Sequence, residues 1–188
     1  MSNPLVALEK ALTRYEEALD VYSVLMHEAK ARLIGMDTAL EGKTGLPNAL
    51  ICEFCFLQLR MLCELIALGC LTAHGDVQIG QDLKKAWQAD KIIRDFEKLH
   101  PPFYPKTAPQ QNEGFTKEEL VKLYRRCGDL LHRGSLQSLW SRDGHGDAGI
   151  EEIRDWKQKI EAQLGHHTIV MADGTTTATF KLWDEPLP

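Results

Sequence analysis

Apolar positions in the first part of the chain recur in alternating steps of three and four residues. Over residues 4–34 they form an a/d repeat of four heptads, whose members are Leu5, Leu8, Leu12, Tyr15, Leu19, Tyr22, Met26, Ala29 and Leu33. Such a repeat predicts one long amphipathic helix, and Pro4 suits its first turn. A seam of this length needs a partner helix, so we expect it to pack inside its own bundle or, less favoured, against a second copy.

The next apolar stretch, residues 48–74, is apolar on most sides and predicts a helix at the centre of a bundle. Glu53, Arg60 and Glu64 interrupt it, and charges near its middle argue against a membrane span. Their spacing of seven and four residues places them on one stripe, where buried charges must be paired. The glycine-rich residues 35–47, between the two helices, predict a loop.

The middle of the chain alternates helical and proline-rich segments. Residues 80–100 predict one or two shorter helices that end before two prolines. The proline-rich connection that follows, roughly 15 residues long, contains Phe103 and Tyr104. These aromatic residues either stack on a nucleic-acid base or pin the connection onto the protein, and pinning is favoured.

The period of the pattern changes near the end of the chain. Residues 150–164 predict a last amphipathic helix, and two β-rich runs then flank Asp173 and Gly174, a pair typical of a type I′ hairpin turn. An isolated hairpin is marginal in water, so it should pack on the bundle or on a partner. We therefore expect a mainly α fold: an up-and-down bundle of four to five helices over residues 1–165, with a C-terminal β-hairpin and tail over residues 166–188, in a single domain.

Composition narrows the functional classes. With 44% hydrophobic residues the chain has enough apolar material for a core, and its formal net charge of −5 argues against nucleic-acid binding driven by bulk charge. The number of cysteines, five, is odd, which favours reduced thiols in a cytoplasmic protein. Cys52 and Cys55 form a CxxC pair in mid-helix, where core thiols are favoured over a zinc or redox site. We expect no signal peptide, no membrane partner, no metal and no cofactor.

Candidate chemistry lies in a predicted helix that Thr116 caps and that runs to about Arg133. At about 100° per residue, Arg125, Asp129 and His132 share one polar face, opposite the apolar residues. The carboxylate and the helix C-terminus favour the protonated imidazole, and a histidine that titrates near neutral pH can transfer a proton during phosphodiester cleavage. The guanidinium can hold the phosphate. The same spacing also fits an ordinary solvent-exposed helix face whose charged residues form ion pairs with one another.

An arginine followed by a histidine after four to six residues, late in a helix of an all-α bundle, resembles the HEPN family of small helical proteins. Here five residues separate Arg126 from His132, and six separate Arg125 from it. The resemblance implies a four- or five-helix bundle that pairs as a homodimer, and its active members are metal-independent ribonucleases. It implies His132 as the acid/base and Arg125 or Arg126 as the phosphate-binding cation.

Two functional interpretations remain open. The first is a cytoplasmic HEPN-like homodimer that cleaves or binds RNA at a cleft containing Arg125, Asp129 and His132. The second is a non-enzymatic helical dimerisation or protein-interaction module that uses the seam of the first helix and the hairpin, with a protein as partner. The remaining histidine candidates, His145 and the His166–His167 pair, are weaker, and a metal site built on them requires ligands that folding brings together.

Overall fold

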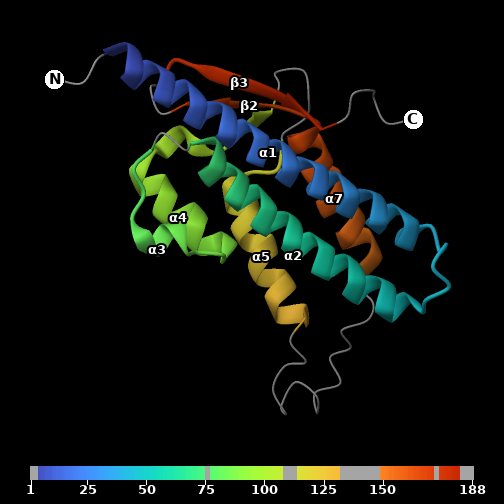
Figure 1. The fold of residues 1–188 in the computed structure, drawn as a ribbon. Helices are drawn as coiled ribbons and strands as arrows, with labels where there is room; N and C mark the ends of the chain where they lie inside the picture. Colours follow the sequence, from blue (N-terminus) through green and yellow to red (C-terminus); the bar gives the residue numbers. More distant parts are fainter. Residues whose placement is uncertain (1–3, 75–76, 108–113, 132–148, 172–173, 183–188) are drawn as a thin grey trace.

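Two long antiparallel helices begin the fold, α1 (Pro4–Leu40) and α2 (Asn48–Ala73) (Figure 1). The computed structural model describes residues 4–74, 77–107, 114–131, 149–171 and 174–182, except for the side chains of residues 4–12, 14 and 15. The expected loop over residues 35–47 is wrong in its first part, because α1 continues through Leu40. Met36 and Ala39 extend the buried stripe of α1, and this packing outweighs the low helix propensity of Gly35, about 1 kcal/mol.

The seam of α1 packs inside the bundle over the part whose side chains are described. Tyr22, Met26, Ala29 and Leu33 are all buried, which leaves no apolar seam at these positions for a second copy. The central place predicted for α2 is confirmed, since it packs against α1 and against three later helices, α4 (Ala89–Leu99), α5 (Lys117–Leu131) and α7 (Gly149–Gly165). Although α2 is apolar and long enough to cross a membrane, 56% of its most apolar window is buried inside the protein, and this burial is compatible with a soluble protein.

Shorter helices surround the central pair: α3 (Gln81–Lys84), α4 (Ala89–Leu99), the 3-10 turn η1 (Pro101–Phe103), α5 (Lys117–Leu131) and α7 (Gly149–Gly165). The proline-rich connection is pinned by its aromatic residues, as favoured from the sequence. Phe103 is fully buried and packs edge-on against Phe96, with ring centroids 5.2 Å apart. The Tyr104 hydroxyl donates to the Phe115 carbonyl at 2.9 Å.

A small antiparallel sheet in the order β1-β2-β3 lies over one end of the bundle, beside α1 and α7 (Figure 1). Its strands are β1 (Lys106–Thr107), β2 (His166–Val170) and β3 (Thr177–Lys181). The predicted hairpin is the β2–β3 pair, in register with His167 opposite Phe180. No sequence pattern predicted β1, a two-residue strand in the proline-rich connection. The fold class is confirmed as mainly helical with a small C-terminal sheet.

Candidate functional site

The helix α5 begins with a reciprocal cap at its first turn. The amide of Glu119 donates to the Thr116 hydroxyl at 3.2 Å, and the Thr116 amide donates to the Glu119 carboxylate at 3.1 Å. This capping box satisfies two amides that a helix start leaves without partners. It confirms Thr116 as the cap and marks where α5 begins, while packing against α2 and α4 decides which residues of α5 point inward.

The predicted inward and outward faces of α5 are confirmed for its described residues. Leu120, Leu123 and Cys127 are fully buried, whereas the Arg125 side chain is 64% exposed and Asp129 is exposed. The third member of the predicted constellation, His132, lies outside the described residues, as does His145. The structure therefore places the arginine and the carboxylate on one outward face and does not place the histidine.

The two candidate arginines have different surroundings. Arg126 forms a fork with Glu152 on α7, in which its Nε and Nη2 each lie 3.2 Å from a carboxylate oxygen. This pair raises the pKa of Arg126 through the side-chain hydrogen bond and ties α5 to α7. Arg125 instead has its Nη2 3.8 Å from the Asp90 carboxylate on α4, a longer contact at an exposed side chain. Arg125 is thus the more available of the two for a phosphate.

Beneath this face lies a polar network between α2 and α5. The Arg60 guanidinium donates to the Tyr124 hydroxyl at 3.2 Å, and that hydroxyl donates to the Glu64 carboxylate at 3.2 Å. Arg60 also lies 3.5 Å from Glu64 and sits over the Tyr124 ring, 4.7 Å from its centroid. Burial is the main cause of the raised pKa of Tyr124, so its hydroxyl keeps its proton. The predicted pairing of the α2 charges is confirmed for Arg60 and Glu64, while Glu53 is exposed.

The Arg60 guanidinium has space in this network because residue 128 is a glycine. A Cβ at this position would lie 3.3 Å from Nη1 of Arg60, tighter than most real contacts. The absence of a side chain therefore lets the guanidinium lie across α5. The sequence did not predict Asp90 and Glu152 as partners, because no spacing rule links residues on α4 or α7 to a face of α5. Tyr124 was missed because no spacing rule links it to Arg60 and Glu64 on α2.

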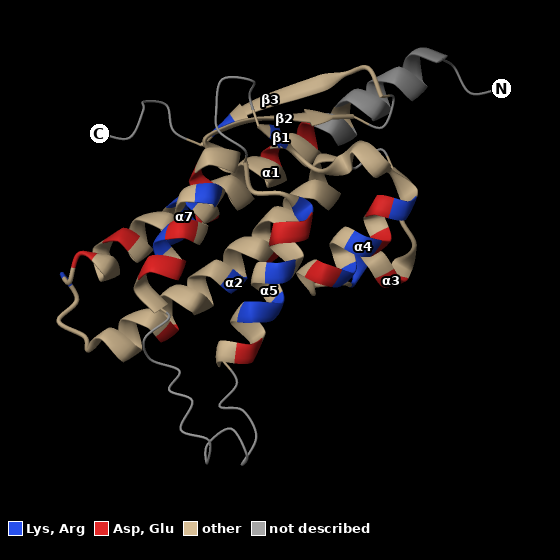
Figure 2. Ribbon diagram, turned by 180° about the vertical axis from the view of Figure 1, so that it is seen from behind, with Lys and Arg blue, Asp and Glu red and all other residues tan. Residues whose placement is uncertain are grey.

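Charges of both signs cover the surface around the site. Lys and Arg alternate with Asp and Glu along α4, α5 and α7 when the protein is seen from behind (Figure 2). Lys122 and Lys159 lie near the Trp156 ring, with their ammonium nitrogens 5.9 and 5.3 Å from its centroid. A ligand at this surface would meet individual cations rather than one continuous basic field.

The five cysteines lie in the interior of this fold. All five are buried and free, as expected for core thiols. Burial raises the pKa of Cys55 to about 11 and that of Cys127 to about 12, so their thiols stay protonated at neutral pH. Within the described ranges, no group of three or more His, Cys, Asp and Glu residues is arranged to hold a metal ion.

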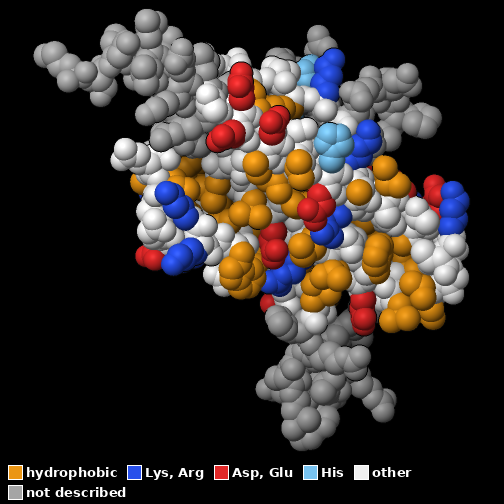
Figure 3. Space-filling view, viewed as in Figure 1, with side chains coloured by type: hydrophobic (Ala, Val, Ile, Leu, Met, Phe, Trp, Pro, Cys, Tyr) orange, Lys and Arg blue, Asp and Glu red, His pale blue; other side chains and the backbone are white. Residues whose placement is uncertain are grey.

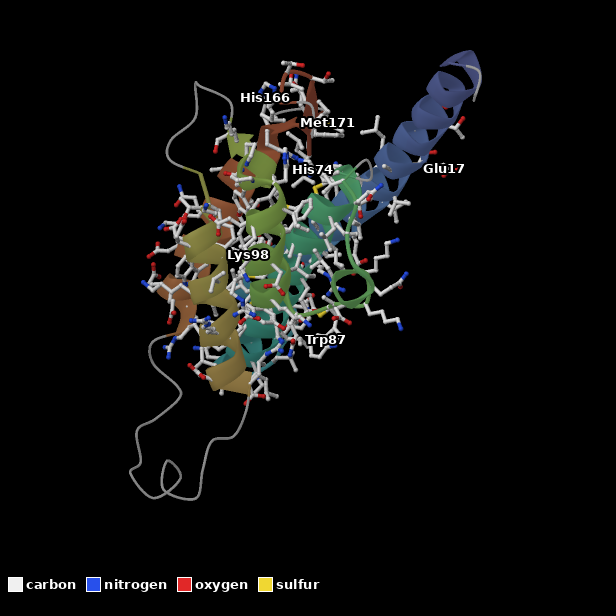
Figure 4. All side chains as sticks on the ribbon, turned by 90° about the vertical axis from the view of Figure 1, so that its left-hand side faces the viewer. Glu17, His74, Trp87, Lys98, His166 and Met171 are labelled. Carbon is white, nitrogen blue, oxygen red and sulfur yellow. The ribbon has the colours of Figure 1, made fainter. Side chains whose placement is uncertain are left out.

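The described histidines of the sheet region hold the structure together. The His167 ring accepts from the Tyr22 hydroxyl through Nε2 and donates from Nδ1 to the Leu164 carbonyl. His74, at the end of α2, contacts the Val170 carbonyl through Nε2 at 2.9 Å, and Figure 4 shows it where α2 meets the sheet near Met171. Because these buried rings contact groups of the protein itself, they are better explained by packing than by catalysis.

Comparison of the chain with protein-family models, with curated proteins and with solved structures found no match.

Proposed function

We propose that the chain is a HEPN-like cytoplasmic ribonuclease or RNA-binding protein that acts as a homodimer without a metal or cofactor. The observation that carries the proposal is the outward Arg125 on a capped helix. Its contact to Asp90 is long, 3.8 Å, so a phosphate can compete for the guanidinium at modest cost. His132 follows Leu131, the last described residue of α5, directly in the sequence.

The proposed reaction needs only proton transfer and charge stabilisation. The RNA 2′-hydroxyl is a nucleophile already positioned beside the phosphorus. His132 takes its proton as the 2′-oxygen attacks the phosphorus. The bond from phosphorus to the 5′-oxygen breaks, the 5′-oxygen takes a proton from the solvent, and a 2′,3′-cyclic phosphate remains. Arg125 stabilises the extra negative charge on the phosphate oxygens in the transition state. Arg126, already paired with Glu152, fixes α5 against α7.

The test is cleavage of labelled RNA by the purified protein in the presence of a chelator. We expect His132→Ala to lower the rate by about 100-fold or more and Arg125→Ala to lower it as well. Arg94→Ala, a change at another exposed arginine paired to a neighbouring acid, should leave the rate unchanged. An RNA with deoxyribose at the cleaved position should resist. Wild-type protein that cleaves no RNA would leave the nuclease part of the proposal without support.

The second candidate function is a non-enzymatic interaction module, and one observation favours it. Leu50, Phe54 and Leu57 on α2 are between 37% and 46% exposed, although apolar side chains of this size are usually buried. If the protein acts only through such a surface, substitutions on α5 would leave partner binding intact, while substitutions on α2 would abolish it.

A further inference from the structure

The outer side of α2 carries a row of apolar side chains that point away from the protein's own core. We call Leu50, Phe54, Leu57 and Met61 the outer row; its spacing of four, three and four residues is that of a and d positions. Leu50, Phe54 and Leu57 are 46%, 37% and 44% exposed, and Met61 is partly exposed. A helix already buried on its other sides thus presents a second seam to solvent.

The outer row belongs to a broader apolar face. Figure 3 shows hydrophobic side chains gathered over the face that carries α1 and α2. With Leu46, which precedes α2 and is 45% exposed, the row leaves on the order of 300 Å² of apolar surface open per copy. A standard interface buries roughly 800 Å² per partner, so this row supplies the apolar centre of an interface and neighbouring residues would supply its rim.

Charges beside the row indicate how a partner helix would run. Glu53 and Arg60 each precede a member of the row by one residue, so they lie on the same flank, seven residues apart. When two copies of one helix pair antiparallel, the same flanks of the two helices face each other; when they pair parallel, opposite flanks do. Only the antiparallel arrangement therefore brings Glu53 of each copy to Arg60 of the other.

From this self-complementary pattern we infer that a second copy of the chain docks on the outer row, with the two α2 helices antiparallel. The charge pairing selects the register in which Phe54 meets Leu57 of the second copy and Leu50 meets its Met61. Such a two-fold interface is closed and isologous. This inference rests on the proposed dimeric function and assigns its surface.

The same register adds a residue to the candidate site. The Arg60 side chain is 23% exposed and already contacts Glu64 and the Tyr124 hydroxyl. Glu53 of the second copy would approach this guanidinium from outside, so each candidate site would receive one carboxylate from the partner. Dimerisation would then stiffen the network that supports the Arg125 face.

The first test measures mass in solution across a concentration series, by light scattering and by sedimentation. We expect wild type to associate with a dissociation constant between about 1 and 100 µM, as for a small interface. Leu57→Asp should give a monomer with an unchanged circular dichroism spectrum. The matched control, Leu99→Asp, changes a leucine of similar exposure at the end of α4 and should dimerise as wild type does. A wild type that stays monomeric, or Leu57→Asp protein that still dimerises, overturns the inference.

The second test reads the register. One chain carries Phe54→Cys and the other carries Leu57→Cys. The two chains are mixed and oxidised, and their disulfides are mapped by mass spectrometry. The native thiols are buried and should not compete. A disulfide between positions 54 and 57 of different copies supports the antiparallel register, whereas exclusive 54–54 and 57–57 bonds would indicate parallel helices and overturn it. If the protein cleaves RNA as a monomer, the proposed interface is wrong and the proposed nuclease activity stands. If the protein forms dimers with the expected cross-link but cleaves no RNA, the proposed interface stands and the proposed nuclease activity is wrong.

Discussion

The stability of the fold should depend on pH through one buried histidine. His167 has no exposed surface, and its ring is held between the Tyr22 hydroxyl, 2.5 Å from Nε2, and the Leu164 carbonyl, 3.0 Å from Nδ1. The Leu164 carbonyl can only accept, so Nδ1 carries the proton and Nε2 accepts from Tyr22. Burial, as the largest cause, lowers the pKa of His167 from 6.5 to about 4.

The magnitude follows from the difference between the folded and unfolded states. The unfolded chain binds a proton at this histidine as pH falls through 6.5, while the folded chain stays neutral until about pH 4. Between these values the unfolded state holds more protons, so the free energy of unfolding decreases as pH falls. At about 1.4 kcal/mol per pH unit, lowering the pH from 7 to 5 should cost about 2 kcal/mol at this residue alone.

The assay is urea unfolding followed by circular dichroism at pH 7 and pH 5. His167→Gln replaces the ring by a side chain that does not titrate and whose amide can still accept from Tyr22. We expect wild type to lose about 2 kcal/mol more than this variant between the two pH values. His27→Gln, a change at an exposed histidine on α1, should behave as wild type. Equal losses in wild type and His167→Gln would refute the reasoning from burial.

Three further predictions concern stability. Thr116→Ala removes the cap of α5 and should lower the free energy of unfolding by about 1 kcal/mol; a melting temperature equal to wild type would contradict the capping role. Tyr124→Phe removes the hydroxyl that donates to Glu64 and accepts from Arg60. It should lower the free energy of unfolding, measured in urea, by about 1–3 kcal/mol. An unchanged free energy of unfolding would mean that water replaces the hydroxyl. Gly149→Ala places a Cβ 2.5 Å from the Cys52 sulfur and should cost about 1–3 kcal/mol. Adding Cys52→Ala should recover part of that loss, and strictly additive effects would argue against the contact.

Local patterns carried most of the fold prediction. The a/d repeat identified the buried stripe of α1, and the apolar composition of residues 48–74 identified the central helix. Thr116 marked the start of α5, and the turn at Asp173 and Gly174 marked the hairpin. These signals work because helix and strand periodicity, capping and turn chemistry depend on residues close together in sequence. The end of α1 and the short strand β1 were not predicted, because both depend on what the segment packs against.

The candidate site was only partly readable from the sequence. Spacing placed Arg125 and Asp129 on an outward face of α5, which the structure confirms. It did not show whether Arg125 or Arg126 is more available to bind a phosphate. The distinction comes from α4 and α7, since Glu152 engages Arg126 closely and Asp90 contacts Arg125 at longer range. Ion-pair partners on other helices do not produce a periodic pattern in the sequence. The role of His132, outside the described residues, remains a prediction.

By itself, the sequence determined the type of most elements, the inward and outward faces of its helices and the need to pair the charges on α2. Only the tertiary structure decided which partner each charge received, that the seam of α1 is used inside the bundle, and that α2 keeps an apolar row facing solvent. The physical reason is range: backbone propensity and side-chain periodicity act within a few residues, whereas burial and ion pairing depend on segments that only the folded chain brings together.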